Sequence, residues 1–258
     1  MGVSVKIISI SNQKGGVGKT TTAVNLGASL SLLGRTVLLI DLDPQANATS
    51  GLGVNPDQIQ FHVYHVLLGE KGLQDVMLPT KVSGLTLVPS HPALVGAEVE
   101  LRESSLRERI VAKAISRIEA PFDYILIDCP PSLGLLTLNA LAACSSLLIP
   151  VQCEYYALEG LKSLLTTYEL VRRRLNPSIY IEGFLLTMFD PRTRLSHDIA
   201  ENMMGHFNSK VFHTIIPRNI RLSEAPSYGL PICLYDISSK GAQHYLLLAK
   251  EIDRKGVA

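Results

Sequence analysis

A glycine-rich segment near the N-terminus carries residue types that bind polyphosphates. It reads Lys14-Gly15-Gly16-Val17-Gly18-Lys19-Thr20-Thr21 and lies between an apolar run and an amphipathic pattern, which predict a strand and a helix. Glycines let backbone N–H groups converge on phosphate oxygens, and a helix N-terminus adds positive potential. Lys19 could then reach the terminal phosphates while the Thr20 hydroxyl ligates magnesium. A glycine-rich turn without function is the alternative, which the combination of residues disfavours.

The same loop holds a second lysine. Lys14 lies five residues before Lys19, where another ammonium could contact the same nucleotide or one held by a facing subunit. A solvated lysine at a loop entrance is the alternative interpretation. The general phosphate-loop pattern asks for a leading glycine where this chain has Gln13, so the match to that pattern is partial.

Three acidic residues follow predicted strands. Asp41 and Asp43 come directly after Thr36–Ile40, and Asp128 follows Tyr124–Ile127. Ligands of open α/β folds bind at the carboxyl edge of the sheet, where these residues would lie. A carboxylate there can orient an attacking water or hold magnesium, directly or through a water. A capped turn is the alternative for each acid alone, but their combination with the loop favours phosphoryl transfer.

Basic side chains are concentrated in residues 171–221. This segment has eight basic and four acidic residues, a local charge of +4 in a chain whose net charge is +1. The basic residues are Arg172, Arg173, Arg174, Arg192, Arg194, Lys210, Arg218 and Arg221. Such a patch fits sequence-independent contact with a phosphate backbone better than base readout, although most charged runs are only solvated faces.

Short apolar runs alternate with helical patterns along the chain. The predicted strands are Lys6–Ile10, Thr36–Ile40, Leu85–Pro89, Tyr124–Ile127, Leu147–Val151, Ile181–Thr187, Val211–Ile216 and Pro231–Leu234. The predicted helices are Thr20–Leu33, Glu98–Ile118, Leu135–Ala143, Tyr156–Leu175, Arg194–Phe207 and Gly241–Arg254. This alternation predicts an α/β fold, a mostly parallel twisted sheet covered by helices on both faces. No repeat or linker divides the sequence, so residues 1–258 are predicted to form a single domain.

Composition excludes several classes of protein. The near-neutral charge excludes a basic tail or an acidic disordered segment as the main feature, and the four cysteines include no C-x-x-C pair. We therefore expect neither a disulfide framework nor a zinc or iron–sulfur site, and an intracellular, reduced protein without a signal peptide. The uncharged stretch from Cys129 to Cys153 is predicted to be a buried helix followed by a strand, not a membrane span.

The loop Lys14–Thr21 resembles the deviant Walker A loop of the ParA/MinD ATPases, a class of P-loop NTPases. In that family the first lysine crosses a two-fold interface to the partner's phosphates, so the resemblance implies this role for Lys14 and an ATP-dependent face-to-face dimer. It implies ATP and Mg²⁺ as ligands and a hydrolytic role for Asp43. Asp128 corresponds to the Walker B carboxylate that acts on magnesium with Thr20. The residues that would contact adenine are Met188, Pro217 and Asn219.

Two longer segments resemble the short ParA proteins of chromosome partitioning, also called Soj. They are 152–160 (QCEYYALEG) and 221–226 (RLSEAP). This resemblance implies that Arg192 and Arg221 contact non-specific double-stranded DNA, and that a ParB/Spo0J-type partner accelerates hydrolysis. It also implies a cytoplasmic, nucleoid-associated protein. Pro191 departs from the commoner residue and could change how Arg192 is presented. No helix-turn-helix pattern precedes the loop, so operator-specific repression is not implied.

Rival functions remain open from the sequence. A MinD-like membrane-cycling ATPase needs a basic amphipathic C-terminal helix. Here Leu246-Leu247-Leu248 with Lys250, Arg254 and Lys255 resembles a packed terminal helix more closely, so no membrane partner is expected. The fold would also suit a metal-cluster carrier, a small-molecule ligase or a structural filament protein, and the cysteine spacing argues against the first of these.

Overall fold

One sheet runs through the molecule. The structure, a computed structural model, describes residues 5–102, 104, 106–154 and 157–256. These residues form seven strands in the order β3-β4-β2-β5-β1-β6-β7. The strands are β1 (Lys6–Ile10), β2 (Val37–Asp41), β3 (Leu78–Pro79), β4 (Leu85–Val88), β5 (Tyr124–Asp128), β6 (Ser146–Gln152) and β7 (Tyr180–Thr187). All neighbours pair in parallel except β3 with β4, which confirms the α/β fold with a mostly parallel sheet.

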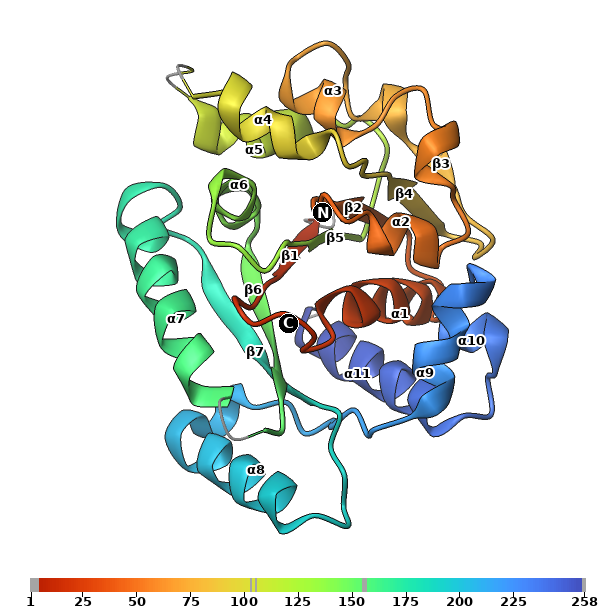
Figure 1. Cartoon of the computed structure of the whole chain (residues 1–258), viewed down its shortest axis with the longest axis vertical. Helices are drawn as coiled ribbons and strands as arrows, with labels where there is room; N and C mark the ends of the chain where they lie inside the picture. The colour runs from red at the N-terminus through yellow and green to blue at the C-terminus, as the bar shows by residue number, and fades with distance from the viewer. Residues whose placement is uncertain (1–4, 103, 105, 155–156, 257–258) are drawn as a thin grey trace.

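Helices cover both faces of this sheet. They are α1 (Lys19–Leu32), α2 (Asn47–Gly51), α3 (Val63–Leu67), α4 (Leu94–Glu100), α5 (Ile110–Ile115), α6 (Leu135–Ala143), α7 (Ala157–Arg174), α8 (Arg194–Phe207), α9 (Ile220–Glu224), α10 (Ile232–Tyr235) and α11 (Lys240–Gly256). Buried side chains of α1, α10 and α11 pack on one face, and those of α3, α6, α7 and α8 pack on the other. Figure 1 shows α1 and α11 side by side, with α6 and α7 across the sheet from them.

The burial of both faces explains the apolar strands. In β2, Val37 and Leu39 contact the cluster that contains α1 and α11, while Leu38 and Ile40 contact the cluster on the opposite face. Successive residues of a strand point to opposite faces, so a strand covered on both sides must be apolar throughout. β2 therefore reaches the ligand edge of the sheet with a fixed register, and its last residue is Asp41.

The prediction of a strand at Val211–Ile216 is wrong. Phe212 N and Ile216 N donate to β7, at 3.0 Å to Phe184 O and 2.9 Å to Leu186 O. Between them, the backbone N–H groups of His213 and Thr214 donate to the Glu251 carboxylate, at 2.9 and 3.0 Å. A carboxylate from α11 thus takes hydrogen bonds that a strand would have used, and no regular ladder forms here in the described chain.

The predicted strand Pro231–Leu234 is also wrong, because these residues begin helix α10. Leu234 N and Tyr235 N donate to Pro231 O at 3.0 and 3.1 Å. Pro231 itself has no N–H, which suits the position before a first helical residue. The Ile232 N–H, which has no acceptor within the helix start, donates to Asn25 Oδ1 at 2.7 Å.

The predicted helix Glu98–Ile118 is divided into separate elements. α4 ends at Glu100, a 3-10 turn covers Arg107–Arg109, and α5 begins at Ile110. Asn139 of α6 marks the boundary between the 3-10 turn and α5, since its side chain accepts from Val111 N at 3.2 Å and donates to Arg107 O at 2.7 Å. This tertiary cap fixes the start of α5.

The uncharged stretch between Cys129 and Cys153 folds as predicted, into helix α6 followed by strand β6. Among the residues that the structure describes, none of the helices combines the length and the apolar character needed to cross a bilayer. α11 buries Tyr245, Leu248 and Ile252 in the cluster that it shares with α1.

Candidate functional site

The glycine-rich loop lies at the carboxyl end of β1 and leads into α1. Gly16 and Gly18 have φ angles of 74° and 85°, in the left-handed region that side chains with a Cβ rarely adopt. Gly15 and Gly16 are accessible, and an added Cβ at either would meet no atom within 4 Å. The glycines therefore serve the backbone path and the access to its N–H groups, not tight internal packing.

Hydrogen bonds to the neighbouring strands β6 and β7 hold this loop in place. Asn12 Nδ2 donates to Pro150 O at 2.7 Å, and its Oδ1 accepts from Lys14 N at 3.0 Å. Thr187 Oγ1 at the end of β7 donates to Val17 O at 2.9 Å. Asn12 was not predicted from the sequence, although a polar residue directly after an apolar strand was the available signal.

Lys19, the first residue of α1, is almost fully buried, with 6% of its surface exposed. Its Nζ donates to Lys14 O at 3.1 Å. Burial lowers the pKa of Lys19, while the nearby carboxylates of Asp128 and Asp43 act in the opposite direction. The structure thus brings together the loop lysine and the two acids that the sequence analysis assigned to phosphate chemistry.

Asp128 offers a cation two oxygens. Its carboxylate is completely buried at the end of β5, and within the described residues neither oxygen has a hydrogen-bond partner. Burial raises the pKa of Asp128 well above its ordinary value, Asp41 adds to that effect, and the Thr20 side chain opposes it. Among the residues described, no three His, Cys, Asp or Glu side chains form a metal cage. Thr20 and Asp128 therefore fit magnesium that takes its other ligands from phosphate and water.

The Asp41–Asp43 turn is fixed by buried hydrogen bonds. Asp41 Oδ2 accepts from Thr49 N at 2.9 Å and from Thr49 Oγ1 at 2.7 Å, and its Oδ1 accepts from Asp43 N at 3.1 Å. Burial raises the pKa of Asp41 above its ordinary value, while the hydrogen bonds from Thr49 and Asp43 oppose that rise. Ser90 Oγ donates to Asp43 O at 2.7 Å, so the backbone of Asp43 is held from both sides. Asp41 thus fixes the backbone position of Asp43.

Ala46, in the same turn, has a backbone conformation that is unusual for a residue other than glycine. Its φ angle is 51°, which is left-handed, and 1% of its surface is exposed. A non-glycine residue in this region carries strain of about 1 kcal/mol. The backbone is therefore strained directly after Asp43.

A cavity of about 440 Å³ adjoins the loop. Gly18 and Thr21 line its loop side, and Met188, Pro217 and Asn219 line it farther along. Asn219 Oδ1 is buried and, in the described part of the chain, without a partner. The three residues assigned to adenine are therefore brought together beside the loop, with an amide oxygen available to bind a polar ring edge.

Other predicted residues also reach this cavity. Gln152, Cys153 and Glu154 line it, whereas Tyr155 and Tyr156 of the same motif lie outside the described residues. Asp190 and Tyr245 also line the cavity, a position that was not predicted from the sequence. Asp190 lies two residues beyond Met188, whereas Tyr245 comes from α11, which only the fold brings to the cavity.

The cysteines are packed residues. All four are free and buried in the part of the chain that the structure describes. Cys129 Sγ lies 3.2 Å from Ser9 Oγ, and burial raises the pKa of the Cys129 thiol to about 12. A thiol with that pKa is protonated at neutral pH, so Cys129 is a packed side chain and not a nucleophile.

The two arginines assigned to DNA are exposed and paired. Arg192 Nη2 lies 2.7 Å from Asp190 Oδ2, with 83% of the arginine side chain exposed. Arg221 Nη1 lies 2.8 Å from Glu224 Oε2, with 54% of the arginine side chain exposed. Each guanidinium is therefore accessible but already bound by a carboxylate of its own chain.

Comparison with known proteins identifies the family. Residues 5–181 match the family described as AAA domain. The chain is 55% identical to the chromosome partitioning protein ParA of Myxococcus xanthus over 250 residues, covering 97% of this chain and 88% of the relative. It is 54% identical to the sporulation initiation inhibitor protein Soj of Bacillus subtilis, with coverage of 97% and 99%.

A solved structure shares the fold. Cobyrinic acid a,c-diamide synthase from Mycobacterium smegmatis, with bound ATP analog and magnesium, superposes with a TM-score of 0.88 at 36% identity, covering 99% of this chain and 97% of the other. Together with the loop geometry and the near full-length relatives, this places the chain in the ParA/Soj family of chromosome-partitioning ATPases, which have the P-loop NTPase fold.

Proposed function

We propose that this chain is a magnesium-dependent ATPase whose ATP-bound dimer binds double-stranded DNA without sequence preference and partitions chromosomal or plasmid DNA. The observation that carries the proposal is the buried Lys19 beside Asp43 and Asp128, at a glycine loop that adjoins a cavity. A positioned ammonium and positioned carboxylates are what phosphoryl transfer requires.

The nucleotide would span the loop and the cavity. Its phosphates would bind the backbone N–H groups of Gly15, Gly16, Val17, Gly18, Thr20 and Thr21 together with Lys19. Adenine would occupy the cavity near Met188, Pro217 and Asn219. Thr20 and Asp128 would hold magnesium, which neutralises phosphate charge when bound. The ATP analog and magnesium bound to the similar M. smegmatis structure support this arrangement.

Hydrolysis would depend on Asp43. Its carboxylate orients a water that attacks the γ-phosphorus, so a new P–O bond forms while the bond to the β–γ bridging oxygen breaks, yielding ADP and phosphate. Lys19 stabilises the charge that develops on the leaving oxygens. Positioning and charge stabilisation supply most of such catalysis, which explains why the backbone of Asp43 is held by Asp41 and Ser90.

Dimerisation would depend on Lys14. In this structure Lys14 Nζ pairs with Glu154 Oε2 at 3.0 Å, with 30% and 51% of the two side chains exposed. An exposed pair of this kind contributes only about 0–1 kcal/mol. Lys14 can therefore leave Glu154 at little cost and bind the phosphates of a facing subunit, which makes ATP a link between two protomers.

DNA binding would follow from dimerisation. Arg192 and Arg221 are exposed, and a two-fold axis would present each of them twice to one duplex. Two linked weak contacts bind more tightly than either alone. A ParB/Spo0J-type partner would stimulate hydrolysis and release the DNA. Such a protein would be found in the cytoplasm on the nucleoid.

The arrangement of the chain favours this function over a membrane cycle. Helix α11 turns Tyr245, Leu248 and Ile252 into the core instead of presenting them to a bilayer. We further propose that the chain acts as a single ATPase domain, since the strands share one sheet and the same core clusters.

Sizing experiments test the proposal. Light scattering after gel filtration would give the mass of the wild type and of Lys14→Ala and Arg221→Glu, with ATP, ADP or no nucleotide, and with or without DNA. We expect the wild type to dimerise only with ATP, Lys14→Ala to stay monomeric, and Arg221→Glu to dimerise without binding DNA. Dimers of Lys14→Ala, or wild-type DNA binding by Arg221→Glu across a salt titration, would contradict it. Sedimentation with liposomes checks the membrane alternative.

A further inference from the structure

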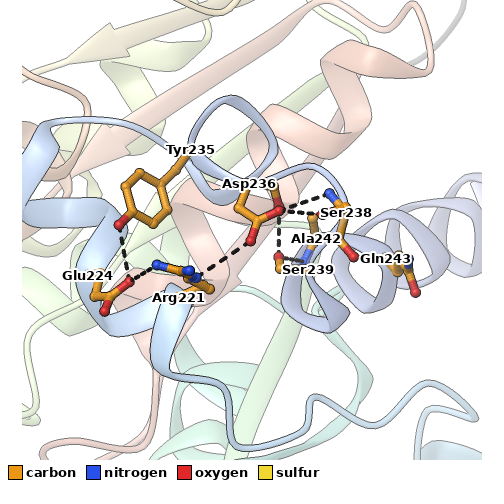
Figure 2. Close-up of polar contacts among 8 residues, drawn as sticks. All are labelled: Arg221, Glu224, Tyr235, Asp236, Ser238, Ser239, Ala242 and Gln243. Atoms are coloured by element: carbon orange, nitrogen blue, oxygen red, sulfur yellow. Dashed lines mark hydrogen bonds and ion pairs between the residues drawn. The ribbon is translucent and has the colours of Figure 1, made fainter.

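Arg221 belongs to a network of charged and polar groups. Figure 2 shows its guanidinium between Glu224 and Asp236. Nη1 lies 2.8 Å from Glu224 Oε2, and Nε lies 3.6 Å from Asp236 Oδ2. Tyr235 OH donates to the same Glu224 oxygen at 3.1 Å. The network joins α9 to the segment between α10 and α11.

The Asp236 carboxylate is fixed by the segment that leads into α11. Asp236 Oδ1 accepts from Ser238 N at 3.1 Å and from Ser238 Oγ at 2.7 Å, and Asp236 O accepts from Ser239 Oγ at 2.8 Å (Figure 2). Ser239 Oγ in turn accepts from Ala242 N at 3.2 Å, in the first turn of α11. Asp236 is therefore held by a helix start, while the Arg221 side chain is half-exposed.

The network carries more negative than positive charge. One guanidinium faces the two carboxylates of Glu224 and Asp236, which gives a net charge of −1 at neutral pH. Hydrogen bonds from Arg221 and Tyr235 lower the pKa of Glu224, so this carboxyl stays ionised. A phosphate that approaches Arg221 must compete with both acids. At Arg192 the competitor is the single carboxylate of Asp190, and that pair is neutral.

We propose that Glu224 and Asp236 compete with DNA phosphate for Arg221 and so limit the DNA affinity of the dimer. The inference rests on the DNA contact proposed above for Arg221. Limited affinity suits a protein that must leave DNA once its dimer separates. The competing acids lie within the same chain, so every protomer carries its own restraint.

The expected effect follows from Coulomb's law. Removing one negative charge about 6 Å from a phosphate in water raises affinity about threefold, and about tenfold for the two copies of a dimer. The gain in DNA affinity should be largest at low salt, because salt screens exposed charges, with a screening length of about 10 Å at 0.1 M. If Glu224 instead oriented Arg221 toward DNA, removing its charge would weaken DNA binding.

Glu224→Gln is the first test, since it keeps the shape of the side chain and an oxygen for Arg221 and Tyr235. Fluorescence anisotropy with a labelled non-specific duplex, in a non-hydrolysable ATP analogue, measures Kd from low to high salt. We expect about tenfold tighter binding at low salt and little gain at high salt. Glu119→Gln, an exposed acid before β5, removes the same charge elsewhere and should leave Kd unchanged.

The outcomes separate the two proposals. If Arg221→Gln weakens binding but Glu224→Gln leaves it unchanged or weaker, the competition is wrong and the DNA contact stands. If Arg221→Gln binds DNA like the wild type, Arg221 does not contact DNA. The proposed competition for Arg221 is then wrong as well. Without Arg221 no phosphate is held near residue 224, so in the double variant the gain from Glu224→Gln should disappear. Should Glu224→Gln fail to form the ATP dimer on sizing, Asp236→Asn makes the same test.

Discussion

Asp43 is buried at the ligand edge of the sheet, and its carboxylate Oδ1 accepts from Gln45 N at 3.0 Å. Asp43→Ala removes the group proposed to orient water but leaves Lys19 and the loop intact. We expect hydrolysis to fall at least about 100-fold, a typical loss for a positioned catalytic side chain. ATP binding should persist, so the variant should remain a dimer on DNA. Phosphate release and DNA sedimentation measure the two effects, and wild-type turnover would refute the role of Asp43.

The chemistry of individual residues was predictable where neighbours in sequence act together. Lys14, Lys19 and Thr20 lie in one short segment, so their spacing alone indicates phosphate binding. Asn12 and Thr187 were not found, because their partners Pro150 and Val17 lie 138 and 170 residues away. The pairing of Arg221 with Asp236 was hidden for the same reason, although Glu224 stands only three residues along the helix.

A side chain of helix α11 accepts backbone hydrogen bonds that strand pairing would otherwise use. Glu251 accepts the backbone N–H groups of His213 and Thr214 at 2.9 and 3.0 Å. Glu251→Ala leaves these donors to water, so we expect a loss of about 1 kcal/mol in the free energy of unfolding. Glu251→Gln keeps one acceptor oxygen and should lose less. Urea unfolding measures both, with Lys250→Ala on the same helix as control. Equal stability of Glu251→Ala and wild type would contradict the explanation.

A second element prediction concerns acid stability. His62 precedes α3, is 5% exposed and stacks on His91, with ring centroids 4.5 Å apart. Burial, with His65 and His91 adding to it, lowers the pKa of His62 to about 4. The unfolded chain binds the proton at its ordinary value near 6.5, so protonation favours unfolding as pH falls from about 6.5 to about 4.

His62→Phe keeps a buried ring and removes this proton linkage. The stability of the variant relative to wild type should therefore rise as pH is lowered through that window and be constant above about pH 7. Urea unfolding at several pH values measures the difference. His206→Phe, at an exposed histidine on α8, provides the control. A stability difference that does not vary with pH would show that His62 is not linked to acid unfolding.

Elements were predicted from the sequence wherever apolar periodicity decided them. The long parallel strands of the sheet and the long helices α1, α7, α8 and α11 agree with the sequence pattern within a few residues. The failures lie where tertiary hydrogen bonds decided the outcome, as Glu251 does at 213–214 and Asn139 does at the start of α5. Periodicity records burial but does not record such partners.

The charged groups of the whole molecule fall into a buried set and an exposed set. A net charge of +1 hides the exposed arginines, each of which pairs with a carboxylate two or three residues away in its own chain. The sheet brings the buried Lys19, Asp43 and Asp128 to one edge, while Arg192 and Arg221 remain outside. The groups proposed to bind ATP and those proposed to contact DNA are therefore separate, and the proposed dimer would join them.

Salt dependence of DNA binding measures how many arginines the dimer uses. Each phosphate neutralised on B-DNA contributes about −0.9 to the slope of log K against log salt, so Arg192 and Arg221 from two protomers predict a slope of about −3.6. Arg221→Gln removes two contacts and should lower the magnitude by about 1.8. Lys113→Gln, an exposed change on α5, should leave the slope unaltered. Binding titrations of the ATP-bound protein at several salt concentrations give both slopes. If the slope of Arg221→Gln equals that of the wild type, Arg221 makes no phosphate contact and the DNA face lies elsewhere on the dimer.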